Sequence, residues 1–153
     1  MDQLTFRLAH NSDVAFLYEA SKLLQSPPLI SEEAYGDFLL SVLAADRRGR
    51  PKSDIWIVEK DKVPSGYILI NYMTMLRYTG FCVEMEEVVI LQKFQKMGIG
   101  RKFINHLIDI YQKMPECRQI LVKTDDELGA GKLYGSILNK TEMKTYKSFL
   151  NKV

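Results

Sequence analysis

The chain has 153 residues and a mass of 17.7 kDa, a size typical of one domain. Its composition is that of a globular protein, it has no apolar run long enough to span a membrane, and 21 basic against 19 acidic residues give no reason to expect nucleic acid as a partner. The two cysteines form no CxxC pair and the amino terminus lacks a signal-peptide pattern, so we expect a cytoplasmic protein with reduced thiols and no metal.

The first half of the chain predicts a strand, two helices and two further strands. An alternating segment indicates a strand over residues 4–8. Apolar residues at helical spacing indicate one helix capped by Asn11 or Ser12, ended by Pro27-Pro28, and a second helix that opens at Ser31. Strands follow at residues 55–59 and 66–75, with a turn over residues 61–65 between them.

The second half predicts two strands joined by a helix. Residues 81–91 form a long strand pattern, rich in β-branched side chains towards its end. After Gly98, one broad apolar face indicates a helix, which runs up to Pro115. A short buried strand at residues 119–123 would then pair in parallel with the long strand, because a helix connects the two. A helix at 131–138 and a strand at 145–150 complete a mixed α/β domain.

A glycine turn joins the long strand to its helix, with the sequence Gln95-Lys96-Met97-Gly98-Ile99-Gly100-Arg101. Glycines let a backbone approach a ligand closely, and the free amides of a helix N-terminus favour phosphate. The alternative is a tight turn that needs Gly98 only for its backbone angles. Two other phosphate motifs fail, because a Rossmann fingerprint would need glycine at Phe103 and the P-loop pattern is not met around Gly131-Lys132.

Gln95–Gly100 fits every fixed position of [Arg/Gln]-x-x-Gly-x-[Gly/Ala], and here the chain resembles the GNAT superfamily of N-acetyltransferases. The opening Arg7-x-Ala9 followed by Asp13 is similar to the family's common start. The resemblance implies a GNAT-like fold, with a central, mostly antiparallel sheet, a parallel pair of fourth and fifth strands, and flanking helices. It also implies a single GNAT domain over residues 1–153 that uses acetyl-CoA as cosubstrate and needs no metal.

The resemblance further implies where acetyl-CoA binds. The pantetheine arm would pair, strand-like, with residues 88–91, and the backbone amides of Lys96, Met97, Gly98, Gly100 and Arg101 would hold the pyrophosphate. The cofactor-binding residues expected on this basis are Val88, Val89, Ile90, Leu91, Gln95, Lys96, Met97, Gly98, Ile99, Gly100 and Arg101.

Three glutamates on the long strand are the candidates for a general base. Strict alternation places Glu84 and Glu86 on one face and Glu87 on the other. Crowded carboxylates raise one another's affinity for protons, which suits a base near neutral pH, whereas the alternative is a solvated strand end. Related GNAT enzymes place a glutamate at positions matching Glu84 in some branches and Glu86 in others, and we favour Glu84 slightly.

Tyr134 is the candidate general acid, because family members often carry a tyrosine here that hydrogen-bonds the CoA sulfur. Core packing is the alternative role. The chain departs from the family after this point, where Leu138-Asn139-Lys140-Thr141 replaces the usual Gly-Phe pair.

These residues predict an N-acetyltransferase that moves an acetyl group from acetyl-CoA to a primary amine by direct attack. The partners expected are acetyl-CoA and an amine acceptor, without nucleic acid or membrane and with a homodimer as an option. The alternatives are a non-catalytic CoA-binding or regulatory module on the same fold, and an unrelated α/β phosphate-binding protein.

Overall fold

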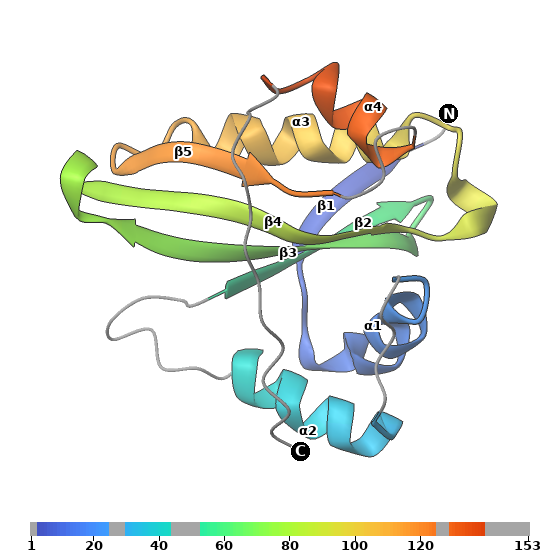
Figure 1. Cartoon of the computed structure of the whole chain (residues 1–153). Coiled ribbons are helices and arrows are strands. Elements are labelled where there is room, and N and C mark those ends of the chain that lie inside the picture. Colours follow the sequence, from blue (N-terminus) through green and yellow to red (C-terminus); the bar gives the residue numbers. More distant parts are fainter. Residues whose placement is uncertain (1–2, 25–29, 44–52, 125–128, 140–153) are drawn as a thin grey trace. The chain divides into compact units, whose positions relative to one another are not determined.

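The computed structural model describes residues 3–24, 30–43, 53–124 and 129–139, and it divides the chain into two units, Met1–Lys123 and Thr124–Val153. The first unit contains a sheet with its helices (Figure 1). Its elements are β1 (Leu4–Leu8), η1 (Asn11–Asp13), α1 (Val14–Ser21), α2 (Glu32–Leu43), β2 (Ser53–Lys60), β3 (Val63–Met75), η2 (Leu76–Tyr78), β4 (Gly80–Ile90), η3 (Gln92–Phe94), α3 (Ile99–Tyr111) and β5 (Cys117–Val122).

The five strands form one sheet in the order β1-β2-β3-β4-β5. All neighbours run antiparallel except β4 and β5, which are parallel and are joined by α3. The predicted fold class, a mostly antiparallel sheet with one parallel pair and flanking helices, is confirmed. The strand predicted at residues 145–150 and the helix-ending pair Pro27-Pro28 lie outside the described residues.

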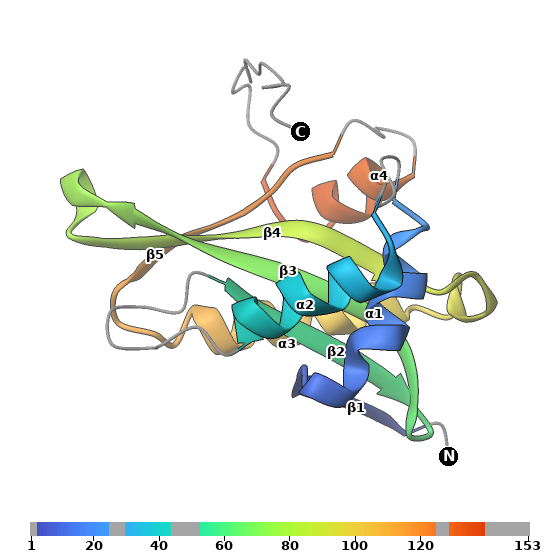
Figure 2. The same ribbon diagram turned by 90° about the horizontal axis from the view of Figure 1, so that it is seen from below.

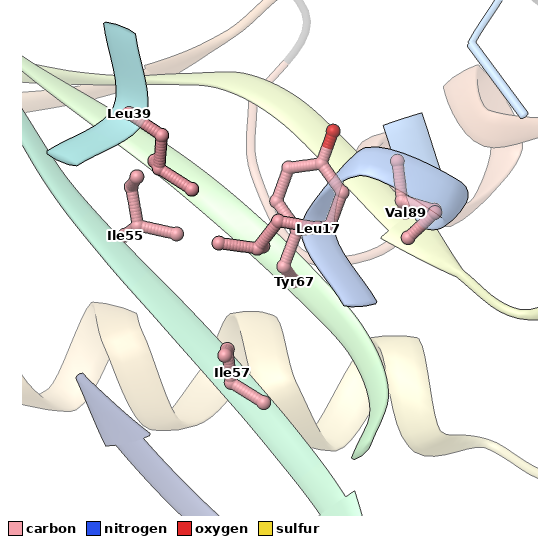
Figure 3. Packing of buried hydrophobic residues seen from close by; sticks show 7 residues of the cluster. Leu17, Leu39, Ile55, Ile57, Tyr67 and Val89 are labelled. Carbon is pink, nitrogen blue, oxygen red and sulfur yellow. The ribbon is translucent and has the colours of Figure 1, made fainter. Parts of the chain in front are cut away.

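Helices cover both faces of this sheet. Figure 1 shows α1 and α2 on one face and α3 on the other, and the view from below in Figure 2 shows α1 and α2 side by side in front of the strands. On the α1/α2 face the buried core consists of Leu17, Ala20, Leu39, Ile55, Ile57, Tyr67 and Val89 (Figure 3). On the other face α3 buries Phe103, Ile104, Leu107 and Tyr111 completely, as its apolar spacing predicts.

The two N-terminal helices begin differently from one another. Ser31 caps α2 as predicted, since its Oγ accepts a hydrogen bond from the amide of Ala34 at 3.2 Å. The cap predicted at Asn11 or Ser12 is wrong, because these residues form the 3-10 turn η1 and the α-helix starts only at Val14. Instead, Oδ2 of Asp13 accepts a hydrogen bond from the amide of His10 at 2.7 Å.

Three other boundaries differ from the sequence prediction. The turn predicted over residues 61–65 is only Asp61-Lys62, whose positive φ angles of 52° and 66° let β3 begin at Val63. The helix α3 ends at Tyr111, before Pro115. The strand predicted as buried is β5, whose residues are exposed or half-buried because it is the last strand of the described sheet.

The second unit contains one described helix, α4 (Ala130–Gly135), which is shorter than the helix predicted over residues 131–138. No helix among the described residues has the length and apolar character needed to cross a membrane.

Candidate active site

A β-bulge in β4 decides which way the three glutamates face. Leu69 of β3 pairs with Glu87 and the next residue, Ile70, pairs with Met85, so Glu86 is an extra residue in β4. Directly paired residues of an antiparallel sheet share a face. The side chains of Glu84 and Glu87 therefore lie on the same face, and the prediction from strict alternation, which separated them, is wrong.

Glu84 is the most buried of the three glutamates, with 5% of its surface exposed. Its Oε1 lies 2.6 Å from Nζ of Lys123, which follows directly after β5. This contact is an ion pair by distance, while Oε1 has no well-aligned hydrogen-bond donor among the described residues. The close contact with the Glu84 carboxylate raises the pKa of Lys123, so this side chain remains a cation beside the carboxylate.

The other two glutamates are more accessible. Glu86 is exposed at the bulge. Glu87 is half-buried, and its Oε2 accepts a hydrogen bond from the hydroxyl of Tyr67 at 2.7 Å. Burial and the negative charge of Glu87 raise the pKa of Tyr67, so its hydroxyl stays protonated and continues to donate. The structure thus brings Glu84 and Glu87 to one face and leaves Glu86 in solvent.

Beyond the bulge, β4 has a free edge. It pairs with β5 only over residues 81–85, whereas residues 87–90 are paired with β3 on one side and, in the described part of the chain, with no strand on the other. Val88, Val89 and Ile90 belong to this free edge and Leu91 directly follows it, so these four residues stand where an extended ligand can add to the sheet.

The glycine turn directly follows this edge and opens α3. Gly98 is the N-cap of α3 with a φ of +74°, and Lys96 also has a positive φ of 62°. Within the described part of the chain, the amides of residues 96–101 donate no hydrogen bond. A row of free amides at the positive end of a helix is an anion-binding arrangement. The pyrophosphate contacts expected at this turn stay a prediction.

The first residue of the motif has a structural task that the sequence did not indicate. Nε2 of Gln95 donates a hydrogen bond to the backbone oxygen of Ile90 at 3.0 Å. This bond ties the turn to the end of β4, so the free edge and the free amides are held beside each other. Ile99, by contrast, is buried and anchors the first turn of α3 in the core.

Tyr134 lies on α4, in the second unit. Burial raises the pKa of its phenol, which keeps the proton on the oxygen at neutral pH. This is the protonation state that a general acid needs before it donates.

Two tyrosines near the glutamates were missed at the sequence level. Tyr67 contacts Glu87 across β3 and β4, and Tyr35 of α2 packs against the same core cluster and is close enough to be influenced by the charge of Glu87. The alternating pattern of β3 places Tyr67 on a buried face, but only the bulge in β4 shows that a carboxylate meets it there.

Comparison with known proteins agrees with this geometry. Residues 17–138 match the acetyltransferase (GNAT) family. The chain belongs to this family. No curated protein sequence matches the chain significantly.

Solved GNAT structures share the fold at low sequence identity. A possible acetyltransferase from Clostridium difficile 630 has a TM-score of 0.81 at 13% identity, covering 97% of this chain and 99% of that one. An aminoglycoside N-acetyltransferase in complex with CoA has a TM-score of 0.76 at 16% identity, covering 97% and 96%. Glucosamine-6-phosphate N-acetyltransferase from Arabidopsis thaliana has a TM-score of 0.73 at 17% identity, covering 96% and 99%.

Proposed function

We propose that this GNAT protein is an N-acetyltransferase that moves an acetyl group from acetyl-CoA to a primary amine. The observation that carries the proposal is the free edge of β4 followed at once by the free amides of residues 96–101. An extended pantetheine arm needs the first feature and a pyrophosphate needs the second. The CoA in the complex of the aminoglycoside acetyltransferase, a protein of the same fold, is consistent with this proposal.

The residues proposed to hold acetyl-CoA are those of the edge and of the turn. Val88, Val89, Ile90 and Leu91 would face the pantetheine arm. The amides of Lys96, Met97, Gly98, Gly100 and Arg101 would bind the pyrophosphate, and the exposed side chains of Lys96, Arg101 and Lys102 would add positive charge. Gln95 belongs to the same proposed set, and its side chain also holds this turn to the end of β4.

We propose Glu84 as the general base. A neutral amine attacks the thioester carbonyl, and the proton that the nitrogen then loses passes to the carboxylate. Glu84 is the most buried of the three glutamates, and its Oε1 lies 2.6 Å from Nζ of Lys123. Glu86 remains the second candidate, acting through water because it is exposed at the bulge.

We propose Tyr134 as the general acid. When the carbon–sulfur bond of the tetrahedral intermediate breaks, the CoA thiolate takes the phenolic proton. Burial raises the pKa of Tyr134, so the phenol carries its proton before transfer. No covalent enzyme intermediate is required in this scheme.

We also propose that the protein acts in the cytoplasm. Both of its cysteines, Cys82 and Cys117, are free thiols, which is typical of a reducing compartment.

Two measurements test the proposed function. Calorimetry with CoA should detect binding, and a thiol-release assay over a panel of amines should detect turnover. The variants Glu84→Gln and Tyr134→Phe should each lower kcat about 100-fold or more while CoA binding is retained. The exposed Glu116 offers a matched control, since Glu116→Gln should leave kcat unchanged.

The outcomes separate the proposal from its alternative. Absence of CoA binding at millimolar concentration would overturn the cofactor site. Binding of CoA without thiol release on any amine would favour a non-catalytic CoA-binding module. Unchanged turnover and pH profile in the double variant Glu84→Gln, Glu86→Gln would exclude both glutamates as the base.

A further inference from the structure

Most buried or half-buried carboxylates of the first unit have a basic partner, and the exceptions among the described residues are Glu87 and Asp54, which accepts hydrogen bonds from two tyrosines. Asp13 and Glu59 both pair with Arg7, and Glu84 pairs with Lys123. Among the described residues no basic side chain pairs with Glu87, and its one hydrogen bond comes from the hydroxyl of Tyr67. A carboxylate partly removed from water without a cation is costly, so this position is suited to a cation that arrives with a ligand.

The groups around Glu87 are those that recognise organic cations. Tyr67 is 2% exposed, and Figure 3 shows its ring beside Leu17 with the hydroxyl pointing away from Ile57. Tyr35 on α2 is half-buried and packs against the core cluster that contains Tyr67. Its ring meets the ring of Tyr18 edge-on, with 5.3 Å between the ring centroids. The face of an aromatic ring attracts an ammonium group, and a neighbouring carboxylate adds the attraction of its negative charge.

The bulge also sets the spacing between Glu87 and the proposed base. On the α1/α2 face Glu84 and Glu87 occupy successive positions of β4, opposite Asn71 and Leu69 of β3. Successive positions on one face of a strand are about 7 Å apart. This is about the distance between the two nitrogens of a short diamine, so one amino group at Glu84 and another at Glu87 can belong to the same acceptor.

We propose that Glu87, held by Tyr67 and flanked by Tyr35, binds a positively charged group of the acceptor, so that the enzyme selects amines with a second positive charge. The inference rests on the proposed function and names its substrate class as diamines and related compounds with two amino groups. Glu87 is the specificity-determining residue in this scheme, and Tyr67 is a positioning residue that fixes its carboxylate.

The test compares 1,4-diaminobutane with 1-aminobutane, which has the same chain length and lacks the second ammonium group. With acetyl-CoA and the intact protein, we expect kcat/KM to be at least about 10-fold higher for the diamine. Glu87→Gln should abolish this preference through a higher KM for the diamine, with the monoamine rate and the KM of acetyl-CoA unchanged. Tyr67→Phe should also raise the KM for the diamine and leave kcat unaltered.

A second arm measures binding without turnover. Calorimetry of 1,4-diaminobutane on the CoA-saturated protein should give a Kd that Glu87→Gln weakens about 10- to 100-fold and Glu116→Gln does not change. Circular dichroism melts verify that each variant is folded.

Three results would overturn the inference: no preference for the diamine, no diamine binding at about 10 mM, or an equal loss on both amines in Glu87→Gln. The failure of CoA to bind would instead overturn the proposed function, and calorimetry of 1,4-diaminobutane on the CoA-free protein and its Glu87→Gln variant would still decide the role of Glu87.

Discussion

Gly98 is the residue whose backbone most constrains the glycine turn. Its φ of +74° is in the left-handed region, while an added Cβ would meet no atom within 4 Å. A side chain at this position therefore has space but an unfavourable backbone conformation, at about 1–2 kcal/mol for an ordinary L-residue. This conformation belongs to the turn whose free amides are proposed to bind the pyrophosphate.

Substitutions of Gly98 distinguish the cost of its left-handed backbone conformation from the cost of a steric clash. We expect Gly98→Ala to lower the free energy of unfolding by about 1 kcal/mol and to weaken CoA binding, with Gly98→Asn closer to the native protein because Asn tolerates this region. Gly135→Ala is the matched control, since Gly135 also has nothing within 4 Å of an added Cβ and has no positive φ. Urea titration and calorimetry measure the two effects, and an equal loss in both variants would contradict the argument.

Glu86 shows, at the same scale, what the sequence could not reveal. The sequence was enough to predict the elements that contain the site, since Glu84, Gln95 and Gly98 all lie in the elements predicted for them. The face on which Glu87 lies was not readable, because one extra residue in a strand reverses the alternation and no local pattern marks it. The contact between Tyr67 and Glu87 follows from that reversal, so it required the structure.

A network of hydrogen bonds fixes the C-terminal end of α3 on the sheet. The hydroxyls of Tyr72 on β3 and Tyr111 on α3 both donate to Oδ2 of Asp54 on β2, at 2.5 and 3.1 Å. Nε1 of Trp56 donates to the Tyr111 hydroxyl at 3.2 Å. Burial and the bond to Asp54 raise the pKa of Tyr72, which keeps its proton in place. The opposite end of α3 is the proposed pyrophosphate site, so this network holds the helix that presents it.

Removal of the Tyr72 and Tyr111 hydroxyls should show that their hydrogen bonds to Asp54 depend on each other. We expect Tyr72→Phe and Tyr111→Phe each to lower the free energy of unfolding by about 1–2 kcal/mol, because Asp54 loses a donor each time. The double variant should differ from the sum of the two losses by at least about 0.5 kcal/mol, since both phenols serve one oxygen. Tyr78→Phe is the control at an exposed site, and strict additivity in urea unfolding would show that the contacts are independent.

For the molecule as a whole, the order and pairing of elements were predictable, whereas the start of α1 was not. The crossover helix between the strands predicted at residues 81–91 and 119–123 is enough to predict parallel pairing, which β4 and β5 have in the structure. Asn11 and Ser12 are residue types that often cap a helix, and this local preference predicted the wrong start for α1. In the structure Asp13 forms an ion pair with Arg7 of β1, and Asn11 and Ser12 lie with it in the 3-10 turn η1. This ion pair joins residues only six apart in the sequence, yet it overrides the local capping preference and leaves no periodic signal.

That ion pair makes the stability of the first unit dependent on pH. Arg7 donates to both oxygens of Asp13, at 2.8 and 2.9 Å, and to Glu59 at 2.8 Å, and so connects β1, η1 and β2. Burial alone would raise the pKa of Asp13, but the hydrogen bonds from Arg7 and from the His10 amide outweigh it, and the pKa lies below its ordinary value of 3.8. A lowered pKa means that the carboxylate stabilises the folded state above pH 3.8 and that this contribution is lost as the pH falls through the folded-state pKa.

The free energy of unfolding should therefore decrease as the pH is lowered below about 4, and Asp13→Asn should remove part of this decrease. At neutral pH the variant should be less stable by about 1–2 kcal/mol, less than for a fully buried pair, because Arg7 is partly exposed and keeps Glu59 as a partner. Asp37→Asn, on the exposed surface of α2, is the matched control and should retain the native pH dependence. Urea unfolding curves of the three proteins at a series of pH values measure the effect, and parallel pH profiles for Asp13→Asn and the native chain would show that the Arg7–Asp13 pair does not contribute.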